Sequence, residues 1–95
     1  WGDNKMIRPF LNVRIISPQQ LLLETQAESI TSKNSIGPFD ILPQHANFIT
    51  MIEDSPILIK VSSKKTLKYT YPLSIILASN NQVNIYTNIL QKNQT

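Results

Sequence analysis

The chain has 95 residues, no cysteine and a formal net charge of +3, and 41% of its residues are hydrophobic. This length and composition fit one globular domain. The lack of cysteine excludes a disulfide framework and a thiolate metal site, and no apolar run reaches the roughly 20 residues that a spanning helix needs. Lysine and arginine are scattered, so we expect no nucleic-acid partner and no direct membrane insertion.

Apolar and polar residues alternate along many short segments, which is typical of half-buried β-strands. In chain order, we expect strands over residues 11–15, 21–23, 39–42, 48–52, 57–61, 67–71, 73–78 and 83–87. Turn-forming residues separate them, and Asn80 and Asn81 tolerate a positive φ angle that closes a tight hairpin. The sequence therefore predicts an all-β fold, an antiparallel β-sandwich or flattened barrel of about eight to ten short strands.

An enzyme needs reactive side chains that converge on one site, and this chain offers few of them. Its carboxylates are Asp3, Glu24, Glu28, Asp40, Glu53 and Asp54. Only the last two are adjacent, and neighbours in a strand point to opposite faces. One histidine and two glycines build neither a metal site nor a phosphate-binding loop. We therefore expect a protein that is not an enzyme, with no catalytic residue, metal or cofactor.

The most distinctive stretch is residues 37–46, GPFDILPQHA. It consists of a turn glycine, a short apolar strand and a Pro-x-His-Ala corner. The simplest role for His45 is a hydrogen bond between its ring and the backbone of this corner. The corner can also lie on a partner surface, and the two roles are compatible.

This stretch resembles the signature G-x-[FL]-x-I-L-P-x-H-A of the epsilon subunit of F-type ATP synthases, called delta in mitochondria. The resemblance runs from Leu11 to Thr87 and includes the turn at Ser17-Pro18 and the closing hairpin at residues 81–85. There are departures from the family pattern. Gln44 stands where the family usually has glycine, Asn47 where it often has proline, and Leu73-Ser74 where it has a Gly-Gly pair. These departures indicate a divergent member.

The resemblance implies a domain organisation. We expect residues 1–5 to be an added leader before Met6, residues 6–88 to form the epsilon-type β-sandwich, and residues 89–95 to be a polar tail. Full-length members of the family continue into a helical hairpin with regulatory and nucleotide-binding roles. We expect this chain to lack that helical domain.

The resemblance also implies a function. It is that of a central-stalk rotor subunit, which couples rotation of the c-ring to the gamma subunit during ion-driven ATP synthesis and performs no chemistry itself. By position, the loop that faces the c-ring is Lys33, Asn34, Ser35, Ile36, Gly37 and Pro38, and the gamma-facing residues are His45, Ala46, Phe48 and Thr50. Ile36 and Phe48 are candidates for an exposed apolar patch, although either residue would also suit the core.

The implied place in the cell is the cytoplasmic face of a bacterial inner membrane, with the mitochondrial matrix or plastid stroma side as the alternative. A second hypothesis is a free-standing β-sandwich binding module with another partner. A third is a small enzyme, which the residue inventory disfavours.

Overall fold

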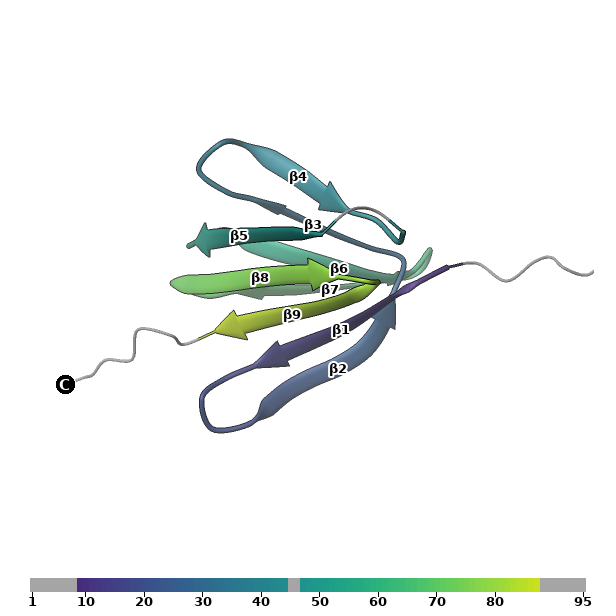
Figure 1. Cartoon of the computed structure of the whole chain (residues 1–95), viewed down its shortest axis with the longest axis horizontal. Helices are drawn as coiled ribbons and strands as arrows, with labels where there is room; N and C mark the ends of the chain where they lie inside the picture. The colour runs from purple at the N-terminus through teal and green to yellow at the C-terminus, as the bar shows by residue number, and fades with distance from the viewer. Residues whose placement is uncertain (1–8, 45–46, 88–95) are drawn as a thin grey trace, which may run out of the picture.

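The computed structural model describes residues 9–44 and 47–87 and folds them into two β-sheets that pack face to face (Figure 1). The strands of the described residues are β1 (Leu11–Ile16), β2 (Leu21–Ala27), β3 (Ser29–Lys33), β4 (Pro38–Ile41), β5 (Phe48–Glu53), β6 (Pro56–Ser62), β7 (Lys65–Thr70), β8 (Leu73–Ser79) and β9 (Gln82–Thr87). The predicted all-β sandwich is confirmed. The strand boundaries differ from the predicted ones mainly at β2, which continues past Leu23 to Ala27 and is followed after Glu28 by β3.

Sheet A has five strands in the order β2-β1-β9-β8-β5, and sheet B has four in the order β4-β3-β6-β7. All described pairs are antiparallel except β1 and β9, which run parallel at the centre of sheet A. The predicted antiparallel sandwich thus contains one parallel pair that the sequence did not indicate. Alternation shows which face of a strand is buried but not its direction, and no hairpin links these two distant strands.

Tight turns close the hairpins where the sequence predicted them. Asn80 and Asn81 have φ angles of 51° and 62°, so both occupy the left-handed region that a two-residue hairpin turn requires. At the start of β2, the Ser17 side chain accepts a hydrogen bond from the Gln20 amide over 3.1 Å. Asp54, with a φ angle of 53°, turns the chain from β5 into β6.

The core lies between the two sheets and consists mainly of β-branched side chains. The buried apolar residues are Leu11, Val13, Ile15, Ala27, Ile30, Ile41, Ile52, Ile57, Ile59, Ile76, Ala78, Val83 and Ile85. They occupy alternate positions in their strands, as the period of two predicts. Their burial against the opposite sheet is the main stabilising contribution to this fold.

Aromatic residues close the sides of the core. The rings of Phe39 on β4 and Phe48 on β5 lie 5.2 Å apart and join the two sheets at one side. Tyr69 and Tyr71 stack at 6.3 Å along the free edge of sheet B. Burial, and secondarily the neighbouring Tyr69, raises the pKa of the Tyr71 phenol.

The connections gather at two opposite ends of the sandwich (Figure 1). At one end, which we call the loop end, lie residues 17–20, 34–37 and 54–55. At the other, the corner end, lie residues 42–44 and the hairpins at residues 63–64 and 80–81. At this end the chain also passes from β2 in sheet A to β3 in sheet B. The Glu28 amide, between the two strands, donates a hydrogen bond to the Lys60 carbonyl over 2.7 Å.

Candidate interaction surfaces

The carboxylates of the described residues are dispersed over the surface and do not converge. Glu24 pairs with Arg14 over 3.0 Å on sheet A, and Glu28 lies 3.9 Å from Lys60 at the corner end. Asp40 accepts a 2.6 Å hydrogen bond from the Thr31 hydroxyl. Within residues 9–44 and 47–87, no three histidine, cysteine or carboxylate side chains lie together as metal ligands would.

The loop between β3 and β4 is held by the side chain of Asn34 and by backbone hydrogen bonds between Asn34 and Gly37 over 3.1 and 3.2 Å. Asn34 Oδ1 accepts hydrogen bonds from the amides of Ile36 and Gly37 over 2.9 and 3.1 Å, and Asn34 Nδ2 donates to Thr50 Oγ1 over 2.9 Å. Gly37 has a φ angle of 148°, which L side chains rarely adopt. These contacts direct the Ile36 side chain away from the protein, and 94% of its surface is exposed. Of the two alternatives for Ile36, exposure is therefore the one that the structure shows.

Lys33 and Pro38 lie at the ends of this predicted loop, but they are paired strand residues. The connection itself is residues 34–37. Beside it, at the loop end, is an open hollow of ≈ 230 Å³ lined by Lys33, Asn34, Ser35, Met51, Glu53 and Ser55. The hollow thus connects the β3–β4 loop with the end of β5. The sequence had assigned the loop and β5 to two separate surfaces.

Pro43 and Gln44, the described part of the Pro-x-His-Ala corner, lie at the opposite end of the sandwich. Gln44 has a φ angle of 66°, and its amide donates a 2.6 Å hydrogen bond to Asn81 Oδ1 of the β8–β9 hairpin. The left-handed φ explains why glycine suits this position. His45 and Ala46 lie outside the described residues, so their proposed roles remain predictions.

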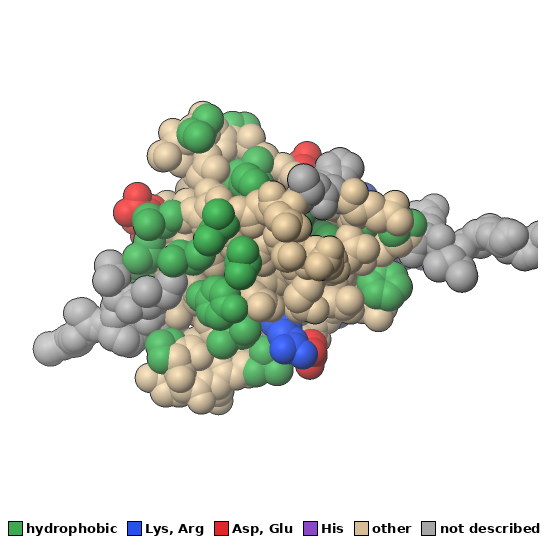
Figure 2. All heavy atoms as spheres, viewed as in Figure 1, with side chains coloured by type: hydrophobic (Ala, Val, Ile, Leu, Met, Phe, Trp, Pro, Cys, Tyr) green, Lys and Arg blue, Asp and Glu red, His purple; other side chains and the backbone are tan. Residues whose placement is uncertain are grey.

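The outer face of sheet A carries a group of exposed apolar side chains. Ile49 and Met51 on β5 are 67% and 53% exposed, and Leu77 on β8 is 39% exposed. The register pairs Ile49 with Leu77 and Met51 with Ile75, so these residues are neighbours on one face. Figure 2 shows hydrophobic side chains gathered on this face over β5, β8 and β9. Exposed apolar groups that cluster in this way mark a protein interaction surface.

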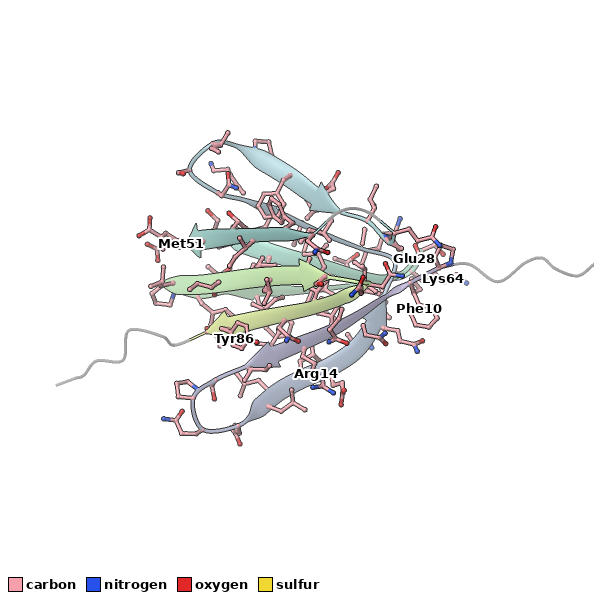
Figure 3. All side chains as sticks on the ribbon, in the orientation of Figure 1. Phe10, Arg14, Glu28, Met51, Lys64 and Tyr86 are labelled. Atoms are coloured by element: carbon pink, nitrogen blue, oxygen red, sulfur yellow. The ribbon has the colours of Figure 1, made fainter. Side chains whose placement is uncertain are left out.

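We call this group the apolar face and define it by Ile49, Met51, Leu73, Ile75, Leu77, Tyr86 and Ile16. Its polar border toward β2 is the Arg14–Glu24 ion pair. In Figure 3, Met51 stands at the loop end of the sheet, while Tyr86 and Arg14 follow on the strands toward β2. The outer face of sheet B differs, because it presents mainly polar side chains such as Thr31, Lys60 and Lys68.

Phe48 and Thr50, two of the predicted gamma-facing residues, lie on the other side of β5. Both are half-buried, Phe48 against Phe39 and Thr50 against the Asn34 amide. Sequence reasoning missed Ile49 and Met51, the outward residues of the same strand. The signal was present, because a strand with apolar residues at consecutive positions places some of them outside the core.

The chain is a small two-layer β-sandwich with an apolar outer face and an exposed, hydrogen-bonded loop. Within the described residues, the structure has no helix that could span a membrane. The chain belongs to the ATP synthase delta/epsilon chain family, and the family's β-sandwich domain matches residues 10–92. The resemblance found in the sequence is therefore confirmed.

Relatives in this family come from plastids and bacteria. The chain is 33% identical over 79 residues to the chloroplastic ATP synthase epsilon chain of Nephroselmis olivacea, covering 82% of this chain and 58% of the relative. It is 35% identical over 54 residues to that of Dictyota dichotoma, covering 57% of this chain and 39% of the relative. The ATP synthase epsilon chain of Rickettsia africae is 29% identical over 77 residues, with 79% and 69% covered. The chain thus spans roughly two-fifths to two-thirds of the length of these relatives.

Solved structures share the fold. A chain of the Euglena gracilis mitochondrial ATP synthase superposes with a TM-score of 0.76 at 16% identity, covering 92% of this chain and 55% of that chain. A chain of the Tetrahymena thermophila mitochondrial ATP synthase, from its central stalk and c-ring, superposes with a TM-score of 0.67 at 13% identity, covering 81% and 62%. At these identities the similarity supports the fold alone.

Proposed function

We propose that this domain is a non-catalytic subunit of the rotor stalk of an F-type ATP synthase, where it couples a c-ring to a gamma-type subunit. Family membership over residues 10–92 carries this proposal. The two surfaces of the domain support it, because a coupling element needs a rigid scaffold with two separate contacts and no reactive site. The complex would place the domain beside a membrane, on the cytoplasmic side in bacteria or the equivalent organellar side.

The apolar face suits the gamma-type partner. Its exposed residues Ile49, Met51 and Leu77 are the kind of side chains that form the buried centre of a stable interface. A partner that covers them would also reach the edge of β5, where Phe48 and Thr50 are half-exposed. His45 and Ala46 precede this strand in the sequence. The predicted gamma-facing residues thereby become the border of a larger contact.

The loop of residues 34–37 suits the c-ring. It protrudes from the loop end (Figure 1), and Ser35 and Ile36 are both exposed. Lys33, at the end of β3, adds a positive charge beside it. Polar and charged contacts of this kind set orientation more than affinity, which is what a contact between a stalk and a ring of identical loops requires.

The experiment is co-purification with the gamma-type subunit and the c-ring of the same organism. We expect Ile49→Asp together with Leu77→Asp to reduce gamma binding, and Lys33→Glu together with Ser35→Glu to reduce c-ring binding. Asn34 is left intact because it holds the loop. Lys68→Glu on the outer face of sheet B is the matched control. A chain that binds neither subunit, or variants that bind as well as the unchanged chain, would contradict the proposal.

A further inference from the structure

The two sheets have four edge strands, β2, β5, β4 and β7. An edge strand presents unpaired backbone groups, and proteins block such edges with short strands, prolines, lysines or bulges. Three of the four edges carry such features. β4 is a four-residue strand that begins with Pro38, and β7 carries Lys65 and Lys68. The pairing of β2 with β1 is irregular, because its register shifts between Ile15 and Ile16.

The β5 edge is built differently. Its sequence, FITMIE, has no proline, lysine or arginine, and its register with β8 is regular over all six residues. In the described part of the chain, β5 pairs with β8 alone. Its outward side chains Ile49 and Met51 are also two of the most exposed apolar residues of the protein. An open, regular, apolar edge of this kind is a template for a further strand.

We propose that the free edge of β5 accepts an extended segment of the gamma-type partner, which adds to sheet A as a sixth strand. This inference rests on the proposed function. It specifies how the partner is held, through backbone hydrogen bonds to β5 as well as contacts with the apolar face. Strand addition gives affinity through the main chain and specificity through alternate side chains.

The chemistry of the added segment follows from β5. Its outward side chains would continue the apolar face next to Ile49 and Met51, so they are apolar at alternate positions. Residues 47–56 contain no lysine or arginine, but Glu53 and Asp54 stand together at the loop end of β5. Both side chains are exposed. The segment therefore carries a basic side chain at the end that passes Glu53, where opposite charges favour one register over its alternatives.

Amide hydrogen exchange of the chain, alone and in complex with the purified gamma-type subunit, tests this inference. Pairing with an added strand would slow exchange at the β5 amides that do not face β8. We expect a slowing of about tenfold or more, because these amides can then exchange only when the complex opens. The corresponding amides of the β2 edge keep their exchange rates and serve as the internal control. A complex that covers only the apolar face leaves the β5 edge amides unchanged.

Three outcomes would contradict the inference. If the complex forms and the β5 edge amides exchange as in the free chain, the strand addition is wrong while the proposed function stands. If no complex forms, both fail together. A chain that dimerises by itself through β5, seen as protection of this edge that grows with its own concentration, would assign the edge to a second copy and overturn the inference.

A charge reversal tests the predicted basic residue. Glu53→Lys is expected to weaken partner binding by about tenfold, as the loss of one attractive surface pair and the gain of one repulsion would do. Lys68→Glu, on the outer face of sheet B, is the charge-reversal control and leaves the affinity unchanged. Circular dichroism confirms that both variants fold. Equal affinities for Glu53→Lys and the unchanged chain would overturn the predicted charge contact.

Discussion

The side-chain amide of Asn34 donates a hydrogen bond to the hydroxyl of Thr50 over 2.9 Å and ties the β3–β4 loop to strand β5. The loop belongs to sheet B and β5 to sheet A, so this contact crosses the sandwich at its open side. It joins the two regions that the sequence assigned to two different partners. A displacement of β5 by a partner would therefore act directly on the loop.

The Asn34 contacts predict a graded loss of stability. Asn34→Ala removes both the hydrogen bond to Thr50 and the acceptor for two loop amides. Thr50→Val removes only the hydrogen bond between Asn34 and Thr50. We expect Thr50→Val to lower the free energy of unfolding by about 1 kcal/mol and Asn34→Ala by about 2 kcal/mol. Urea unfolding measures both. Equal losses would show that the loop amides do not depend on Asn34.

Gly37 predicts a purely conformational effect. Its φ angle of 148° disfavours any L side chain, yet a Cβ atom built there meets no other heavy atom within 4 Å. We therefore expect Gly37→Ala to cost about 1–3 kcal/mol through backbone strain and not through a clash. Thermal unfolding gives the loss, and Ser35→Ala in the same loop is the control. A neutral Gly37→Ala would mean that the loop readily takes another conformation.

Asn81 has two separable roles. It holds a φ angle of 62° in the hairpin turn, and its Oδ1 accepts the hydrogen bond from the Gln44 amide. Asn81→Gly keeps the backbone freedom and loses the acceptor, while Asn81→Ala loses both. We expect unfolding free energies about 1 kcal/mol lower for the glycine variant and about 2 kcal/mol lower for the alanine variant. The reverse order would refute the left-handed turn.

Truncation to alanine should lower the free energy of unfolding by very different amounts at two neighbouring residues of β5. Ile52 is 1% exposed and faces the core, while Met51 is on the apolar face. Ile52→Ala should therefore cost about 2–5 kcal/mol of unfolding free energy, and Met51→Ala no more than about 0.5 kcal/mol. Chemical denaturation of the two variants measures this contrast. A larger loss for Met51→Ala than for Ile52→Ala would place β5 one residue out of register.

Tyr71 predicts a loss of stability at high pH. Burial raises the pKa of this phenol above its ordinary value of about 10, so the folded state holds the proton more tightly than the unfolded chain. The resulting stabilisation is present below about pH 10 and disappears as the pH rises through the raised pKa. The free energy of unfolding of the unchanged chain should therefore fall relative to that of Tyr71→Phe as the pH rises above about 10. A difference that is constant with pH would contradict the shift.

The sequence determined the strands and the faces that they bury. Leu11, Val13 and Ile15 alternate with polar residues, and all three are in the core. Asn80 and Asn81 predicted their hairpin because few residues tolerate a positive φ angle. The residues around Gly37 and Pro43 indicated the family. Each of these properties is local, because it depends on neighbours within a few positions of the chain.

The tertiary structure decided the rest. The parallel pair of β1 and β9 joins strands from opposite ends of the chain, and no local pattern encodes the direction in which distant strands meet. β5 has apolar residues at consecutive positions, so only the packing of sheet A on sheet B separates the inward Phe48 and Thr50 from the outward Ile49 and Met51. Its position at the edge of sheet A leaves its backbone edge open. Which residues a partner can reach is set by which strands lie at an edge, and that depends on long-range pairing.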